Sequence, residues 1–237
     1  MDKLFKQRIF KIGFEGHTLV GDVISGDQAP RVLVLHGAGD SHRGRFQWLR
    51  EKLLSRGISS VAFDFMGHGD TGGDLKSSSL GSRTRQACCI VEALNMQQPL
   101  AVIGASMSAY TAVKLLEHYD VAKLILLVPA MYSAEAYNIP FNKGFTEIIR
   151  RPNSWNHSDA WQLLTQYTGR LLVIAGENDK VIPPTVITTI YDSAINAAER
   201  DLYTAPNASH FVFTDLQAND TDNLDFALSL VLEMLTK

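Results

Sequence analysis

Short apolar segments alternate along most of the chain with longer segments in which apolar residues recur every three or four positions. The short segments are typical of strands buried on both faces of a parallel sheet. They lie at 31–35, 58–64, 100–103, 123–128 and 170–175. The longer segments are typical of amphipathic helices. They lie at about 45–56, 80–95, 109–119, 159–166, 185–194 and 222–235. This alternation predicts a mostly parallel sheet with right-handed crossovers and helices on both faces.

Three further segments extend or interrupt the alternation. Residues 4–14 and 18–24 are rich in β-branched and aromatic residues around Gly16-His17, which predicts an antiparallel hairpin at a sheet edge. A short strand at 200–204 brings the sheet to about eight strands. Residues 131–157 are aromatic-rich but irregular. No repeat or composition break divides the chain, so we expect residues 1–237 to form one α/β domain.

The irregular segment 131–157 is too aromatic for a flexible linker. A loop of this length inside a compact domain is usually functional. We therefore predict a small cap over a pocket, with one or two short helices. The alternative is a packed excursion that does not touch a ligand.

The stretch 100–110 combines a strand, a very tight turn and a helix around Ser106. The neighbours of this serine are glycine, alanine or serine, apart from Met107, and small residues allow strand and helix backbones to approach closely. Such a turn exposes a serine hydroxyl at its tip. The alternative is that Ser106 is an ordinary helix N-cap. The pattern resembles the Gly-x-Ser-x-Gly nucleophile elbow of the α/β-hydrolases, with Ser108 in place of the last glycine.

A serine nucleophile needs a histidine to accept its proton and a carboxylate to orient that histidine. In the α/β-hydrolases the acid and then the histidine follow the serine along the chain. The resemblance implies that Asp179 and His210, each just after a predicted strand, take these roles. Glu177 and Asp215 are the competing carboxylates, and the resemblance favours Asp179 because it directly precedes an apolar–proline run, as the acid of the family does.

His210 comes after the serine in the sequence and lies just after a predicted strand. None of the other histidines meets both conditions. His36 and His68 lie before the serine in glycine-rich turns, and we interpret them as structural.

The resemblance also implies an oxyanion hole of two backbone amides. One is the amide of Met107, which follows the serine, and the other is that of Ala38, with Gly39 a close alternative. Gly37 and Gly39 are predicted to border the substrate pocket. The aromatic composition of the predicted cap adds Tyr132 and Phe141 to that lining, together with the Met107 side chain.

The resemblance to α/β-hydrolases spans about residues 18–235. The turn at 64–71, Asp-Phe-Met-Gly-His-Gly-Asp-Thr, resembles that of short-cap carboxylesterases, including cinnamoyl and feruloyl esterases. It implies a cofactor-independent serine hydrolase that cleaves a small or medium carboxylic ester. Thioesters, small-peptide amides, a carbon–carbon bond next to a ketone, and haloperoxidase-like or acyl-transfer chemistry remain alternatives. A non-catalytic binding protein of the same fold is an alternative of another class.

Charge and composition narrow the partners further. The formal net charge of −3 gives no indication of nucleic acid or a membrane surface as partner. Cys88 and Cys89 are adjacent, which indicates reduced thiols in a reducing compartment. There is no signal-peptide core and no apolar run long enough to span a bilayer, so we expect a cytoplasmic protein.

No zinc-ligand spacing and no phosphate-binding glycine loop occurs either, so no metal or cofactor is expected. The pattern leaves the oligomeric state open.

Overall fold

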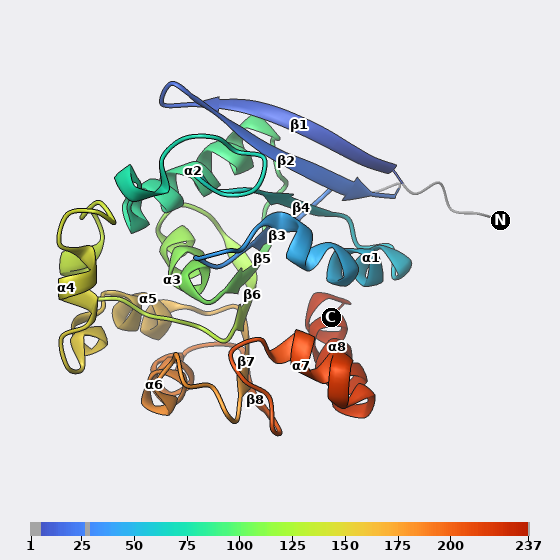
Figure 1. Cartoon of the computed structure of the whole chain (residues 1–237). Coiled ribbons are helices and arrows are strands. Elements are labelled where there is room, and N and C mark those ends of the chain that lie inside the picture. The colour runs from blue at the N-terminus through green and yellow to red at the C-terminus, as the bar shows by residue number, and fades with distance from the viewer. Residues whose placement is uncertain (1–5, 27–28, 237) are drawn as a thin grey trace.

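The computed structural model describes residues 6–26 and 29–236 (Figure 1). An eight-stranded sheet with the order β1-β2-β4-β3-β5-β6-β7-β8 runs through this part of the chain. The strands are β1 (Lys6–Phe14), β2 (His17–Ser25), β3 (Val32–Leu35), β4 (Ser60–Phe63), β5 (Leu100–Ala105), β6 (Val121–Leu127), β7 (Arg170–Gly176) and β8 (Glu199–Ala205). The β1–β2 and β2–β4 pairs are antiparallel and the others are parallel. The predicted sheet is confirmed, while residues 4 and 5 of its predicted first strand lie outside the described residues.

Helices cover both faces of the sheet. They are α1 (Gln47–Ser55), α2 (Leu80–Ala93), α3 (Met107–Lys114), α4 (Phe145–Ile149), α5 (Ala160–Gln166), α6 (Pro184–Ser193), α7 (Val212–Asn219) and α8 (Thr221–Thr236). In Figure 1, α1, α7 and α8 lie on one side of the sheet and α2, α3, α5 and α6 on the other. This is the α/β architecture that the alternation predicts, and it agrees with the fold that the resemblance to α/β-hydrolases implies.

The strand residues divide between two apolar cores because successive side chains point to opposite faces. In β5, Leu100 and Val102 belong to the core under α2 and α3, and Ala101 and Ile103 belong to the core under α1, α7 and α8. A strand buried on both faces therefore needs an unbroken apolar run, which is the pattern that predicts these strands.

Residues 131–157 form a packed segment that contains η4 (Ala134–Ala136), α4 and η5 (Ser154–His157), three short helices rather than one or two. Backbone hydrogen bonds tie it to the start of α2: Gly81 N donates to Tyr137 O at 2.7 Å and Phe141 N donates to Ser78 O at 2.9 Å. In Figure 1 its helix α4 lies at the outer edge of the molecule, beyond α3.

Helix α7 is not predicted by the pattern. Its eight residues directly follow the loop that carries His210, and they are too short to show a helical period. Within the described residues, no helix combines the length and the apolar character needed to cross a membrane.

Candidate active site

Ser106 is the single residue between the end of β5 and the start of α3. Its backbone has φ 50° and ψ −117°, a conformation that costs a non-glycine residue about 1–3 kcal/mol. The turn is held by Ser106 N, which donates to Leu127 O at 2.9 Å, and by Ser106 O, which accepts from Ala109 N and Ala130 N. The Ser106 side chain makes no capping hydrogen bond, so the structure does not support the N-cap alternative.

The glycine two residues before the serine is required by close packing. A Cβ at Gly104 would lie 2.5 Å from Ser108 O and 2.8 Å from Ala112 Cβ. Gly37, from the loop after β3, approaches the serine from another side, where its Cβ would lie 3.2 Å from Ser106 Cβ. The strand, the helix and this loop therefore meet around Ser106.

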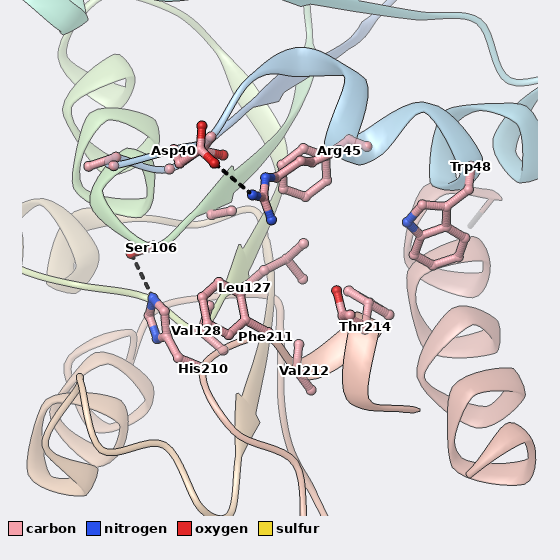
Figure 2. Close-up of a pocket in the computed structure, with 17 residues that line it drawn as sticks. Asp40, Arg45, Trp48, Ser106, Leu127, Val128, His210, Phe211, Val212 and Thr214 are labelled. Atoms are coloured by element: carbon pink, nitrogen blue, oxygen red, sulfur yellow. Dashed lines mark hydrogen bonds and ion pairs between the residues drawn. The ribbon is translucent and has the colours of Figure 1, made fainter. Parts of the chain in front are cut away.

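His210 and Asp179 complete a hydrogen-bonded chain that starts at Ser106. His210 follows β8, and its Nε2 lies 2.9 Å from Ser106 Oγ (Figure 2). Asp179 follows β7, and its Oδ2 lies 2.8 Å from His210 Nδ1. The second carboxylate oxygen of Asp179 accepts from Val181 N at 2.7 Å and Ile182 N at 3.1 Å, which fixes the carboxylate.

The same contacts determine which imidazole nitrogen carries the proton. An ionised carboxylate only accepts hydrogen bonds, so His210 Nδ1 donates to Asp179. Nε2 is then the basic nitrogen, and it faces the Ser106 hydroxyl. The competing carboxylates face elsewhere: Glu177 accepts from Asn207 N, and Asp215 accepts from Ser209.

The loop after β3 presents backbone amides beside the serine. Ala38 lines the same cavity as Ser106, and its amide donates no hydrogen bond to any of the described residues. The amide of Met107 lies at the first position of α3, where helix amides lack an intrahelical acceptor. Two free donors therefore flank the serine at the predicted positions.

His36 and His68 are both buried and pack against each other, with ring centroids 4.9 Å apart. His36 Nε2 accepts from Phe65 N at 3.1 Å, which leaves Nδ1 to donate to Gly37 O at 2.8 Å. Burial holds the pKa of His36 well below its usual value, and the positive charge of Arg83 adds to this effect. The pKa of His68 is also lowered, chiefly by burial.

A cavity of about 300 Å³ opens at Ser106 and extends away from the sheet edge, between the segment 37–48 and the segment 210–214 (Figure 2). Its wall is largely apolar and includes four aromatic residues, Phe46, Trp48, Phe211 and Phe213. The Trp48 and Phe213 rings meet edge to face with centroids 5.2 Å apart. The charged pair Asp40–Arg45, 3.8 Å apart and largely exposed, lies on the same lining.

Comparison with known proteins agrees with this geometry. A family model described as "Serine aminopeptidase, S33" matches residues 26–155, more than half of the chain, including the turn at Ser106. The chain belongs to this family of α/β-hydrolases. It is therefore a hydrolase, and the matched region ends before Asp179 and His210.

Solved structures with the same fold cover nearly the whole S33-family chain. An esterase of Pyrococcus furiosus, Pf2001, is 22% identical with a TM-score of 0.71, over 99% of this chain and 93% of that chain. Est1E of Butyrivibrio proteoclasticus, determined with ferulic acid bound, is 17% identical with a TM-score of 0.71, over 94% and 99%. A predicted CIB-like hydrolase of Thermoplasma acidophilum is 13% identical with a TM-score of 0.70, over 97% and 99%. None of the curated proteins matches this chain.

The cavity of the S33-family protein corrects part of the predicted lining. Gly37 and Gly39 border it, but the side chains of Tyr132, Phe141 and Met107 do not. The Tyr132 ring packs against Tyr110 and Phe145, with centroids 5.7 and 5.8 Å away, and Phe141 packs 4.8 Å from Phe145. The aromatic residues of segment 131–157 are therefore used in holding that segment against α3.

The aromatic wall on the other side of Ser106 is not predicted from the sequence. Phe46 and Trp48 fall within the helix predicted at about 45–56, which carries no signal for a pocket, and Phe213 belongs to α7. Only Phe211 carries a local signal, because it follows His210 directly.

Cys88 and Cys89 lie on α2 as free thiols, away from this lining. Across residues 6–26 and 29–236, no group of three or more His, Cys, Asp or Glu side chains is arranged to hold a metal ion.

Proposed function

We propose that this S33-family protein is a cofactor-independent serine hydrolase that cleaves a small or medium carboxylic ester through an acyl-enzyme. The observation that carries the proposal is the hydrogen-bonded chain of Ser106, His210 and Asp179 at a strained turn, beside an open apolar cavity. A protein that only binds a ligand has no need for a base aligned with an exposed serine. The non-catalytic alternative is therefore disfavoured.

In the first half of the reaction, Ser106 Oγ attacks the ester carbonyl carbon while His210 Nε2 takes the serine proton. The carbonyl oxygen becomes an oxyanion, which accepts hydrogen bonds from the amides of Met107 and Ala38. Each such donor is worth roughly 3–4 kcal/mol in the barrier. Asp179 stabilises the imidazolium form of His210.

Acylation is completed when the tetrahedral intermediate collapses and the bond to the alcohol oxygen breaks. His210 gives its proton to this oxygen, and the acyl group stays on Ser106. Water then enters, loses a proton to His210 Nε2 and attacks the acyl carbon. Collapse of the second intermediate returns the proton to Ser106 Oγ and releases the carboxylic acid.

The cavity supports a substrate with an apolar or aromatic part. Its aromatic wall, which includes Trp48 and Phe213, is suited to exclude water from an acyl chain or ring. A volume of about 300 Å³ lies at the small end of the range for ligand pockets. The esterases among the solved structures, and the ferulic acid bound to one of them, support the ester as the scissile bond.

Amide hydrolysis is the second candidate, because the matching family is described as a serine aminopeptidase. An aminopeptidase must bind the free α-ammonium group of a peptide, which requires an acceptor beside the serine. Asp40 is the single carboxylate on the cavity lining within the described residues, and it is exposed and lies 3.8 Å from the Arg45 guanidinium. This arrangement favours the ester over the peptide.

Active-serine labelling tests the nucleophile. The intact protein is treated with a fluorophosphonate, and its mass is read beside those of Ser106→Ala and the control Ser229→Ala, an exposed serine on α8. We expect a single adduct on the wild type and on the control, and none on Ser106→Ala. An adduct that persists in Ser106→Ala, or no adduct on the folded wild type, overturns the assignment.

A substrate panel then tests the bond. It contains p-nitrophenyl esters, matched thioesters and aminoacyl anilides, each compared by kcat/KM. We expect the esters to be hydrolysed fastest, with loss of turnover in Ser106→Ala. A higher kcat/KM for the anilides would assign the protein as an aminopeptidase instead, and a higher value for the thioesters would make it a thioesterase.

A further inference from the structure

Arg83, on the first half of α2, is fully buried but forms no ion pair among residues 6–26 and 29–236. Its guanidinium lies 3.7 Å from the centroid of the Phe65 ring, and its Nε and Nη1 atoms have no hydrogen-bond partner there. Burial lowers the pKa of Arg83 to about 9, so the group is still a cation at neutral pH. An unpaired buried charge is costly, and such an exception calls for a reason.

All of the hydrogen bonds of this guanidinium come from one atom. Nη2 donates to His36 O at 2.8 Å, to Gly37 O at 3.0 Å and to Ser108 Oγ at 2.8 Å. The Ser108 hydroxyl in turn donates to His36 O at 2.5 Å. Arg83 therefore holds the carbonyl groups of His36 and Gly37, in the loop that precedes Ala38, and Ser108 holds the first of them together with Arg83.

The carbonyl of Gly37 and the N–H of Ala38 belong to one peptide group. Gly37 O accepts from the Arg83 cation and also from His36 Nδ1. A hydrogen bond to a carbonyl oxygen polarises its peptide, and the N–H of the same peptide becomes a stronger donor. Two donors on Gly37 O also fix the orientation of the peptide plane and hence the direction of the Ala38 N–H.

Ser108 occupies the position of the last glycine in the Gly-x-Ser-x-Gly pattern. Its side chain is fully buried, and its hydroxyl connects α3 to His36 O. A glycine there could not make this connection. The departure from the pattern therefore ties the helix that carries the Met107 amide to the loop that carries the Ala38 amide.

We propose that Arg83 and Ser108 are positioning residues of the oxyanion hole: Arg83 orients and polarises the Gly37–Ala38 peptide for the tetrahedral intermediate, and Ser108 fixes the preceding His36–Gly37 peptide and accepts from the Arg83 guanidinium. The proposal rests on the proposed function, because it requires an oxyanion at Ser106. Neither residue touches the reacting atoms; both act through backbone carbonyl groups of the loop.

The effect belongs to the transition state, which separates it from a purely structural role. Ground-state binding in the apolar cavity is unchanged when the peptide is less polarised, so KM stays constant while kcat falls. The affinity for a trifluoromethyl ketone measures the same contact between the oxyanion and the amides of the hole. Ser106 Oγ adds to its carbonyl carbon, the serine proton moves to His210, and the carbonyl oxygen becomes an oxyanion in the hole.

The experiment compares Arg83→Met, Arg83→Lys and Ser108→Gly with the wild type. Arg85→Met is the matched control, because Arg85 lies on the same helix but is exposed and pairs with Glu15. Each variant is checked for folding by circular dichroism and for its Ser106 adduct with a fluorophosphonate. The readouts are kcat and KM for the best ester of the panel, and the inhibition constant of the matching trifluoromethyl ketone.

For Arg83→Met we expect kcat to fall roughly 10- to 100-fold with KM within about twofold, since loss of a whole oxyanion donor costs about 10²–10³. The ketone inhibition constant rises by the same factor. Arg83→Lys recovers part of the loss because it restores the cation. Ser108→Gly loses roughly 3- to 10-fold in kcat, and Arg85→Met keeps the wild-type values.

Each other outcome overturns the proposal. A folded Arg83→Met variant with wild-type kcat and ketone affinity refutes it and leaves the proposed function intact, since Ser106 still reacts. A rise in KM alone assigns Arg83 to the shape of the pocket. If Arg83→Met does not fold, Ser108→Gly decides, and unchanged kcat there is a refutation. A wild type without Ser106-dependent turnover refutes the proposed function and this inference together.

Discussion

The backbone of Ser106 stores strain that the surrounding residues hold in place. Its positive φ would relax in an isolated peptide, but Leu127 O and the amides of Ala109 and Ala130 fix both ends of its peptide groups. In this conformation Ser106 Oγ lies 2.9 Å from His210 Nε2. A reactive serine here depends on three backbone hydrogen bonds, one to α3 and two to the end of β6 and the residues just after it.

Asp179 sets the tautomer of His210, and this leads to a prediction at the residue scale. In Asp179→Asn the amide nitrogen can donate to Nδ1, which favours the tautomer with the proton on Nε2 and removes the base from Ser106. We expect kcat to fall by about 10³–10⁴ with little change in KM, measured on the best ester of the panel.

Glu177→Gln is the matched control. Glu177 lies in the same loop and is exposed, and it bonds Asn207 N instead of His210. It is expected to keep kcat within about threefold of the wild type. Comparable losses in the two variants would contradict the assignment of the acid to Asp179.

At the scale of elements, the cavity is built by two segments that are far apart in the sequence. The segment that includes η1 (Arg43–Phe46) and α1 supplies Phe46 and Trp48, and α7 supplies Phe213. Segment 131–157 instead packs on α2 and α3. The aromatic wall of the cavity therefore comes from elements other than the segment predicted as a cap.

This arrangement predicts which substitutions change acyl-chain preference. Trp48→Ala removes the ring that packs on Phe213 and lengthens the cavity, so we expect the ratio of kcat/KM for long over short acyl chains to rise about tenfold, the order expected for one or two methylene groups. The measurement is a series of p-nitrophenyl esters of increasing acyl length.

Phe141→Leu serves as the control for this series, because Phe141 lies outside the cavity lining and packs on Phe145. Its chain-length profile should match the wild type. A shift with Phe141→Leu and none with Trp48→Ala would place the acyl chain under segment 131–157, as the sequence predicts.

At the scale of the whole molecule, buried neutral histidines link stability to pH. The pKa of His36 is well below 6.5 in the folded protein and that of His68 is also lowered, whereas both return to about 6.5 on unfolding. Below pH 6.5 the unfolded chain thus binds more protons than the folded one. The free energy of unfolding therefore decreases as the pH is lowered, until the pH reaches the folded-state pKa.

We expect His36 to contribute up to about 1.4 kcal/mol of this loss per pH unit below 6.5. Urea unfolding at pH 7.5, 6.5 and 5.5 measures it. In His36→Gln the decrease between pH 6.5 and 5.5 should be smaller by about 1 kcal/mol, because the unfolded histidine is already half protonated at pH 6.5, whatever the stability of the variant at pH 7.5. Parallel curves for the wild type and His36→Gln would show that His36 is not held neutral by the fold.

Local pattern in the sequence determined the sheet, the helices on both faces and the positions of Ser106, Asp179 and His210 at the ends of β5, β7 and β8. These features follow from the hydrophobic period and from turns at strand ends. Both signals are local, because each depends on residues that are close together in the sequence. Even there, Asp179 and Glu177 were separated by a sequence pattern alone, and the structure separates them by the hydrogen bond to His210.

Only the tertiary structure decided which aromatic residues line the cavity at Ser106 and which hold segment 131–157 in place. Tyr132, Phe141, Trp48 and Phe213 have the same chemistry, and their roles depend on contacts between segments distant in the chain. The position of Arg83 is of the same kind: the sequence shows a basic residue on an amphipathic helix, and only the fold buries it behind the Gly37–Ala38 peptide. Hydrophobic period predicts which face of an element is buried, but what that face contacts depends on how all the elements pack together.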